Sequence, residues 1–88
     1  MEYNNKHIAF LRYSFNNVVG AIRISSINNI VWDKDVLYIN DIPIVTVNSS
    51  SNIHKLLIDK ILIHIKLEDV DLNVNDLLLS LVEGDLVE

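Results

Sequence analysis

The amino-acid sequence predicts an α+β fold: a small antiparallel sheet of three or four strands, one main helix packed on it and a short acidic C-terminal helix. Two observations indicate the sheet. Runs rich in Val and Ile alternate apolar with polar residues, and Asn-Asn or Asn-Asp pairs separate the runs. A third observation indicates the main helix, because apolar residues recur at helical spacing after a Ser-rich stretch. The 88 residues are expected to form a single domain, residues 1–88, with a small but sufficient core.

The first predicted hairpin joins residues 7–15 to residues 18–25. In "HIAFLRYSF" two sets of side chains alternate, which favours a strand. The second run, "VVGAIRIS", is rich in β-branched residues and alternates in the same way. Asn16 and Asn17 between the runs are typical turn residues, so the two strands are expected to be neighbours.

Residues 26–35 are interpreted as a connector between two hairpins. Ile27, Ile30 and Trp32 are expected to turn inward and cover one edge of the core, because large apolar side chains are mostly buried. The sequence Asp33-Lys34-Asp35 is expected to form an exposed tip.

The second predicted hairpin, residues 36–48, turns at Asn40-Asp41. Both residues tolerate the positive φ angles that a two-residue turn of the primed type requires. Pro43 cannot donate a ladder hydrogen bond, so the start of the second strand is expected on a sheet edge or beside a bulge.

The main helix is predicted over residues 51–65, after a stretch, "NSSSN", whose side-chain oxygens can cap a first turn. Its apolar arc is wider than one face of a sheet needs. The arc consists of Ile53, Leu57, Ile58, Ile61, Leu62 and Ile65. The polar side of the helix consists of Lys55, Asp59 and Lys66. An alternative stays open for residues 61–67, because "KILIHIKLE" also alternates with the period of a strand.

The last part of the chain is expected to hold a loop or edge strand and then a short helix over "DLLLSLVEG". Asn73 or Asn75 would cap this helix, Asp76 would suit its positive N-terminal end, and Gly84 would close it. Its apolar face would comprise Leu77, Leu78, Leu81 and Val82, with Leu79 pointing elsewhere.

Composition limits the class of protein. Half of the residues are hydrophobic and 22% are charged, which is too apolar for disorder and leaves apolar surface that favours self-association as a homo-oligomer. Cysteine is absent, and neither a signal peptide nor an apolar run of membrane-spanning length is visible, so a cytoplasmic protein that does not enter membranes is expected. Abundant Asn and Ile suggest an AT-rich genome, such as that of a low-GC bacterium, its phage or an archaeal virus.

Charge is divided unevenly along the chain. Residues 1–66 hold seven Lys or Arg and five Asp or Glu, a net charge of +2, whereas residues 67–88 hold seven acidic residues and no basic one, a net charge of −7. The basic residues are scattered and do not interleave with aromatic residues. Direct binding to nucleic acid is therefore not expected.

No motif indicates catalysis, a metal or another cofactor. The three histidines show no metal-ligand spacing; His54 is expected to be solvated and His64 to be partly buried near Lys60. No serine lies in a nucleophile elbow. Asp33, Asp35 and Asp41 could converge as paired carboxylates, but solvated turn residues are the simpler interpretation.

The acidic C-terminal region is the candidate binding site, and three interpretations of it stay open. It could solubilise a helix that completes the core, dock on a second copy of the chain, or recognise a partner protein with a basic surface. The predicted partner-binding residues are Asp69, Asp71, Asp76, Leu79, Glu83 and Asp85. In size and charge the chain resembles small acidic phage proteins that inhibit host nucleic-acid machinery. The hypothesis is a non-enzymatic protein-binding module of that kind; the alternative is an oligomer that binds a small ligand or nucleotide in pockets between subunits.

Overall fold

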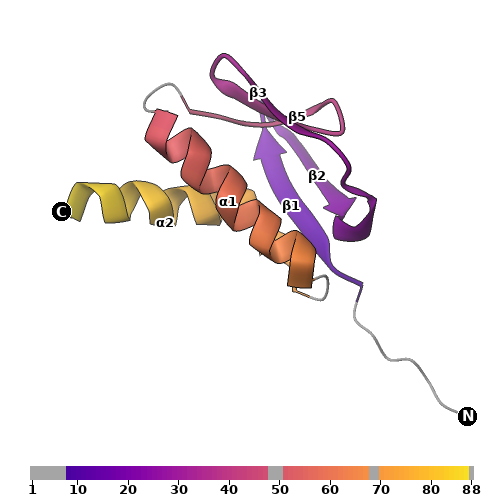
Figure 1. The fold of residues 1–88 in the computed structure, drawn as a ribbon. Helices are drawn as coiled ribbons and strands as arrows, with labels where there is room; N and C mark the ends of the chain where they lie inside the picture. Colours follow the sequence, from indigo (N-terminus) through magenta and orange to yellow (C-terminus); the bar gives the residue numbers. More distant parts are fainter. Residues whose placement is uncertain (1–7, 48–50, 68–69, 88) are drawn as a thin grey trace, which may run out of the picture.

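Five strands precede the first helix, and a short sixth strand lies between the first and the second helix. The computed structural model describes residues 8–47, 51–67 and 70–87 (Figure 1). Along these residues the elements are β1 (Phe10–Phe15), β2 (Val18–Arg23), a 3-10 turn η1 (Ile24–Ser26), β3 (Ile30–Asp33), β4 (Val36–Ile39), β5 (Ile42–Thr46), α1 (Ser51–Leu67), β6 (Leu72–Asn73) and α2 (Val74–Val87).

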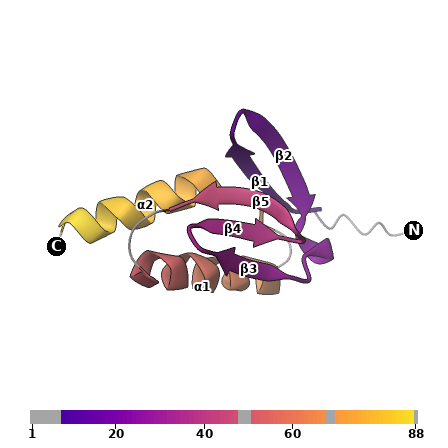
Figure 2. The same ribbon diagram turned by 90° about the horizontal axis from the view of Figure 1, so that it is seen from above.

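The strands form two three-stranded sheets, in the orders β2-β1-β6 and β3-β4-β5. Pairing is antiparallel between β1 and β2 and throughout the second sheet, whereas the short β6 runs parallel to β1. The two sheets meet where β1 packs beside β5, and the β1–β2 hairpin diverges from the second sheet (Figure 2). The α+β class with a main helix and a short C-terminal helix is confirmed.

Both predicted hairpin turns are confirmed by their backbone angles. Asn16 and Asn17 have φ angles of 50° and 67°, and Asn40 and Asp41 have φ angles of 54° and 67°. Two consecutive positive φ angles define the primed turn, whose twist matches that of the flanking strands. Asn and Asp adopt these angles more easily than other non-glycine residues, so the turn chemistry determines both hairpins.

The interpretation of residues 26–35 as an irregular connector was wrong in part, because Ile30–Asp33 form the strand β3. This strand pairs along β4, and the φ angle of 60° at Lys34 lies in the tight turn between them. Ile30 and Trp32 are partly buried against the core, as is Ile27, so their predicted inward orientation is confirmed.

Pro43 lies in a strand at the edge of its three-stranded sheet and beside a bulge, as predicted. The register between β4 and β5 shifts between Leu37 and Tyr38, which leaves Ile44 as an extra residue on β5. The bulge interrupts the alternation of the strand, so that Ile44 and Val45 are both buried although they are neighbours in sequence.

The observed ends of the two helices differ in part from the predicted ones. α1 continues to Leu67, so residues 61–67 are helical. α2 continues through Gly84 to Val87, and Gly84 does not have the positive φ angle of a terminating glycine, so its predicted role as helix end was wrong. The predicted capping stretch before α1 lies largely outside the described residues.

The core lies where the second sheet, α1, β1 and the start of α2 come together. Ile53, Leu57 and Ile61 of α1 are buried, while Leu62 is about half exposed. The largest fully buried side chains are those of Leu11, Ile24, Leu37, Ile39, Ile44, Leu57, Ile61 and Val74. Over the described residues, neither helix has the length and apolar content that crossing a bilayer would take.

Candidate functional site

The start of α2 is anchored to β1 by two side chains that flank β6. Asp71 Oδ1 accepts a hydrogen bond from the Phe10 main-chain N–H at 2.9 Å, and Asp71 Oδ2 lies 3.8 Å from the Arg12 guanidinium. Asn75 Oδ1 accepts from the Ser14 N–H at 2.9 Å, and Asn75 Nδ2 donates to the Ser14 carbonyl at 3.3 Å. These bonds extend the two-residue pairing of β6 with β1 in both directions and fix the position of α2.

A side-chain cap begins α2. Asn73 Oδ1 accepts a hydrogen bond from the Asp76 main-chain N–H at 3.0 Å, so Asn73 is the cap and Asn75 is used for the anchor. The Asp76 side chain lies exposed in the first turn. A negative charge is favourable there, because the unpaired N–H groups give a helix a positive N-terminal end.

The first two turns of α2 expose one acidic and one apolar side chain. Asp76 is exposed, and Leu79 is 57% exposed. Spacings of three and four residues place positions 76, 79 and 83 on one face of a helix. We call these three positions (Asp76, Leu79 and Glu83) the α2 outer face. The inner side of the helix packs on the core through Leu77, Leu78 and Leu81.

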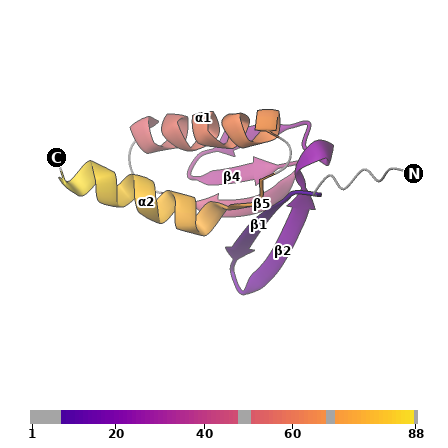
Figure 3. The ribbon, with the colours of Figure 1, turned by 90° about the horizontal axis from the view of Figure 1, so that it is seen from below.

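The other predicted partner-binding residues lie apart from this face. Asp71 is engaged by β1, as described above. Asp85 is nine residues beyond Asp76, which places it on the opposite side of the helix. Asp69 lies outside the described residues. The structure therefore groups three of the six predicted positions, on a helix that extends past α1 and both sheets (Figure 3).

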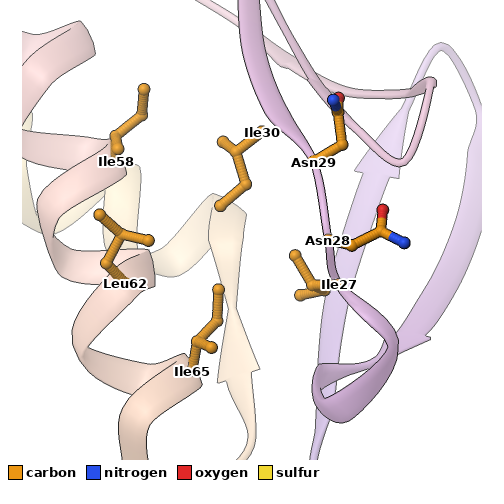
Figure 4. A pocket seen from close by; sticks show the side chains of 7 residues that line it. All are labelled: Ile27, Asn28, Asn29, Ile30, Ile58, Leu62 and Ile65. Atoms are coloured by element: carbon orange, nitrogen blue, oxygen red, sulfur yellow. The ribbon is translucent and has the colours of Figure 1, made fainter.

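A groove separates the C-terminal half of α1 from the chain leading into β3 (Figure 4). Its volume is about 390 Å³, and it is lined by Ile27, Asn28, Asn29, Ile30, Ile58, Leu62 and Ile65, which we call the α1 groove. Both asparagine side chains point away from α1, so the facing walls are aliphatic (Figure 4). A neighbouring hollow of about 410 Å³ adds Ile63 and Lys66. The wide apolar arc of α1 was the sequence signal for this surface, but the facing wall was not predicted.

His54 is part of a packed contact, so the prediction of a solvated residue was wrong. Its ring stacks on the Trp32 indole with 3.7 Å between ring centroids and 11° between the planes. His54 Nε2 lies 2.8 Å from the Val47 carbonyl, and Trp32 Nε1 donates to the His54 carbonyl at 3.1 Å. This contact fixes the start of α1 against β3 and the end of β5. His64 is partly buried, with Nδ1 3.3 Å from the Lys60 carbonyl, as predicted.

The three aspartates that could have formed paired carboxylates lie at two different turns. Asp33 and Asp35 lie at the turn before β4, whereas Asp41 lies at the turn after it, so the strand length separates these carboxylates. Among the described residues, no three His, Asp or Glu side chains come close enough to hold a metal ion.

Comparison with protein families, characterised proteins and solved structures found no match for this chain.

Proposed function

We propose that the protein acts by binding another protein, without catalysing a reaction, and that the α2 outer face meets a basic surface on the partner. The observation that carries this proposal is the exposure of Asp76 and Leu79 together on a helix that contains no Lys or Arg. The helix extends past the rest of the described chain, so a partner can approach it without meeting the sheets (Figure 3).

Charge and apolar contact have different parts in this binding. The net charge of −7 over residues 67–88 attracts a basic surface over long range, which mainly raises the association rate. Leu79 provides apolar area that is removed from water on contact and slows dissociation. Asp69, Asp71 and Asp85 add to the same field, while Asp71 also holds the helix in place.

The test compares two double variants with the same change in net charge. Asp76→Asn/Glu83→Gln neutralises the α2 outer face, and Asp33→Asn/Asp35→Asn, at the exposed turn before β4, is the control with the same change in net charge away from α2. Each variant and the wild type is immobilised and exposed to a cell extract, and the proteins retained are identified by mass spectrometry. The expected result is a partner with a basic surface that the wild type and the control retain and the face variant loses.

The kinetics then separate recognition from simple solubilisation. With the purified partner, the face variant should associate about tenfold more slowly, and the wild-type rate should fall as salt rises from about 0.05 to 0.5 M, where charges are screened within a few ångströms. Leu79→Ser should mainly accelerate dissociation. Equal binding by both double variants, with no salt dependence, would show that the acidic residues only solubilise the helix.

An inhibitor is the form of this function that size and charge favour, because an acidic face can occupy a surface that otherwise holds nucleic acid. A DNA or RNA oligonucleotide should then compete with the protein for the partner. Simultaneous binding of the oligonucleotide and the protein to the partner would contradict the inhibitor form and leave protein binding intact.

A second candidate function is the binding of a small ligand, and the α1 groove is the observation in its favour. Its volume of about 390 Å³ falls in the range of small-molecule sites. Its lining carries no cation, which favours an apolar ligand over a nucleotide. A rise in melting temperature with an apolar ligand, in the absence of any protein partner, would support this alternative.

A further inference from the structure

Two exposed charges on α1 lie on either side of Leu62, the exposed aliphatic residue of the α1 groove. Leu62 is 48% exposed, and Ile58 and Ile65, one turn away on either side, are partly buried against the core. Asp59 and Lys66 are both exposed, and neither forms an ion pair within the described part of the chain. The uncovered aliphatic surface of the groove therefore lies next to one exposed charge of each sign on α1.

The spacing of these charges makes the surface complementary to itself. Asp59 and Lys66 are seven residues apart, so they lie two turns apart on the same side of α1. They are also equally distant from the midpoint between Leu62 and Ile63. When two copies of such a helix pack antiparallel about that midpoint, Asp59 of each copy lies opposite Lys66 of the other.

The same arrangement covers the groove. In this register each residue faces the one at the same distance on the other side of the midpoint, so Leu62 of each copy lies beside Leu62 and Ile65 of the other, which line the facing groove. Both an apolar contact and two reciprocal ion pairs then arise from one symmetric operation.

We infer that the protein forms a two-fold symmetric homodimer in which α1 packs antiparallel on α1 of a second copy, with Leu62 in the facing groove and reciprocal Asp59–Lys66 pairs beside it. This interface uses no residue of the α2 outer face. Its failure therefore leaves the proposed function untouched, and the failure of the proposed function leaves the dimer untouched.

Charge reversals test the register of the two helices. In a homodimer of Asp59→Lys, two lysines face each other at both ends of the interface, and in a homodimer of Lys66→Asp two aspartates do. Each reversal should raise the dissociation constant about tenfold, because two exposed pairs per dimer change from attractive to repulsive. An equimolar mixture of the two variants restores opposite charges at both ends and should dimerise as the wild type does.

Sedimentation velocity from about 1 to 300 µM provides the measurement. Leu62→Asp should raise the dissociation constant more than about a hundredfold, since two charges are buried per dimer. Val19→Asp is the matched control, because Val19 is 81% exposed on β2 and lies outside the interface, so the dimer should persist. Circular dichroism confirms that each variant folds, and the charge reversals keep the test informative if Leu62→Asp does not fold.

Three outcomes would overturn the inference. A wild-type monomer at 300 µM rules out the dimer. If this monomer binds the apolar dye anilinonaphthalene sulfonate, and Leu62→Asp abolishes that binding, the groove serves an apolar small molecule. A dimer that tolerates Leu62→Asp uses another surface. A dimer that is lost with Leu62→Asp but does not respond to the charge reversals or to their mixing lacks the antiparallel register.

Discussion

Asn40 and Asp41 occupy the central positions of one turn, but only Asn40 ties the turn to the rest of the protein. Asn40 Oδ1 accepts a hydrogen bond from the Asn28 N–H at 3.0 Å, and Asn40 Nδ2 donates to the Ser26 carbonyl at 2.9 Å. The Asp41 side chain is exposed and forms no hydrogen bond with the described residues. Replacing each residue with glycine therefore separates the backbone effect from the side-chain effect.

The expected energies follow from this difference. Asp41→Gly should be neutral or stabilise by up to about 1 kcal/mol, because glycine adopts positive φ freely. Asn40→Gly gains the same backbone relief but loses two hydrogen bonds, each with a net contribution of about 0.5–1.5 kcal/mol. The free energies of unfolding of the two variants should therefore differ by about 1–3 kcal/mol, with Asn40→Gly the less stable.

Urea unfolding followed by the fluorescence of Trp32, the single tryptophan, gives these free energies directly. The linear extrapolation should give equal slopes for both variants and different midpoints. Equal midpoints would refute the contribution of the Asn40 hydrogen bonds. A loss of more than about 1 kcal/mol in Asp41→Gly would refute the primed turn itself.

Two further predictions concern the contacts that hold the helices. Trp32→Phe removes the indole N–H that donates to the His54 carbonyl and should lower the free energy of unfolding by about 1–2 kcal/mol. Circular dichroism in urea measures this change, and an unchanged midpoint would show that the hydrogen bond does not stabilise the protein. Asn75→Ala removes both hydrogen bonds to Ser14 and should lower the free energy of unfolding by about 1–2 kcal/mol. Ser80→Ala, an exposed change in the same helix, should alter it by no more than about 0.5 kcal/mol. Equal changes in the two variants would rule out the anchor.

Local chemistry explains why both hairpins could be predicted from the sequence. Each turn consists of two adjacent residues that tolerate positive φ, and the flanking runs alternate, so all the information lies within about a dozen residues. β3 was missed because it is only four residues long, its sequence Ile-Val-Trp-Asp does not alternate apolar with polar residues, and two asparagines precede it. Its strand character depends on pairing with β4, and the tight turn at Lys34 carries none of the usual turn pairs.

Tertiary burial, and not local pattern, decided between helix and strand at the end of α1. A strand would place Ile61 and Ile63 on the same face, whereas a helix places Ile61 in line with Leu57. Ile61 is fully buried and Ile63 is 51% exposed, which is the helical outcome. The sequence carried both periods, so the choice required the position of the second sheet.

In the candidate site, too, the features that depend on neighbouring residues could be predicted, and those that depend on distant residues could not. Helical spacing alone grouped Asp76, Leu79 and Glu83, but the role of Asp71 depends on β1, which lies about sixty residues earlier in the chain. A parallel pairing of only two residues leaves no periodic signal in the sequence. The predicted cap was correct for Asn73, whereas the use of Asn75 as an anchor follows from the same pairing.

The anchor also determines which charges in this segment can be removed without moving the helix. Asp71 contributes a negative charge and, at the same time, accepts the Phe10 N–H, so Asp71→Ala would release the start of α2 as well as change the charge. Asp71→Asn retains an acceptor oxygen for the Phe10 N–H but removes the charge and with it the ion pair to Arg12. The Asp76 side chain accepts no main-chain hydrogen bond within the described residues. Asp76→Asn therefore leaves in place the hydrogen bond from the Asp76 main-chain N–H to Asn73 Oδ1 that caps the helix. A loss of binding in Asp76→Asn/Glu83→Gln therefore reports on charge at the α2 outer face, whereas a loss in Asp71→Ala would report equally on a displaced helix.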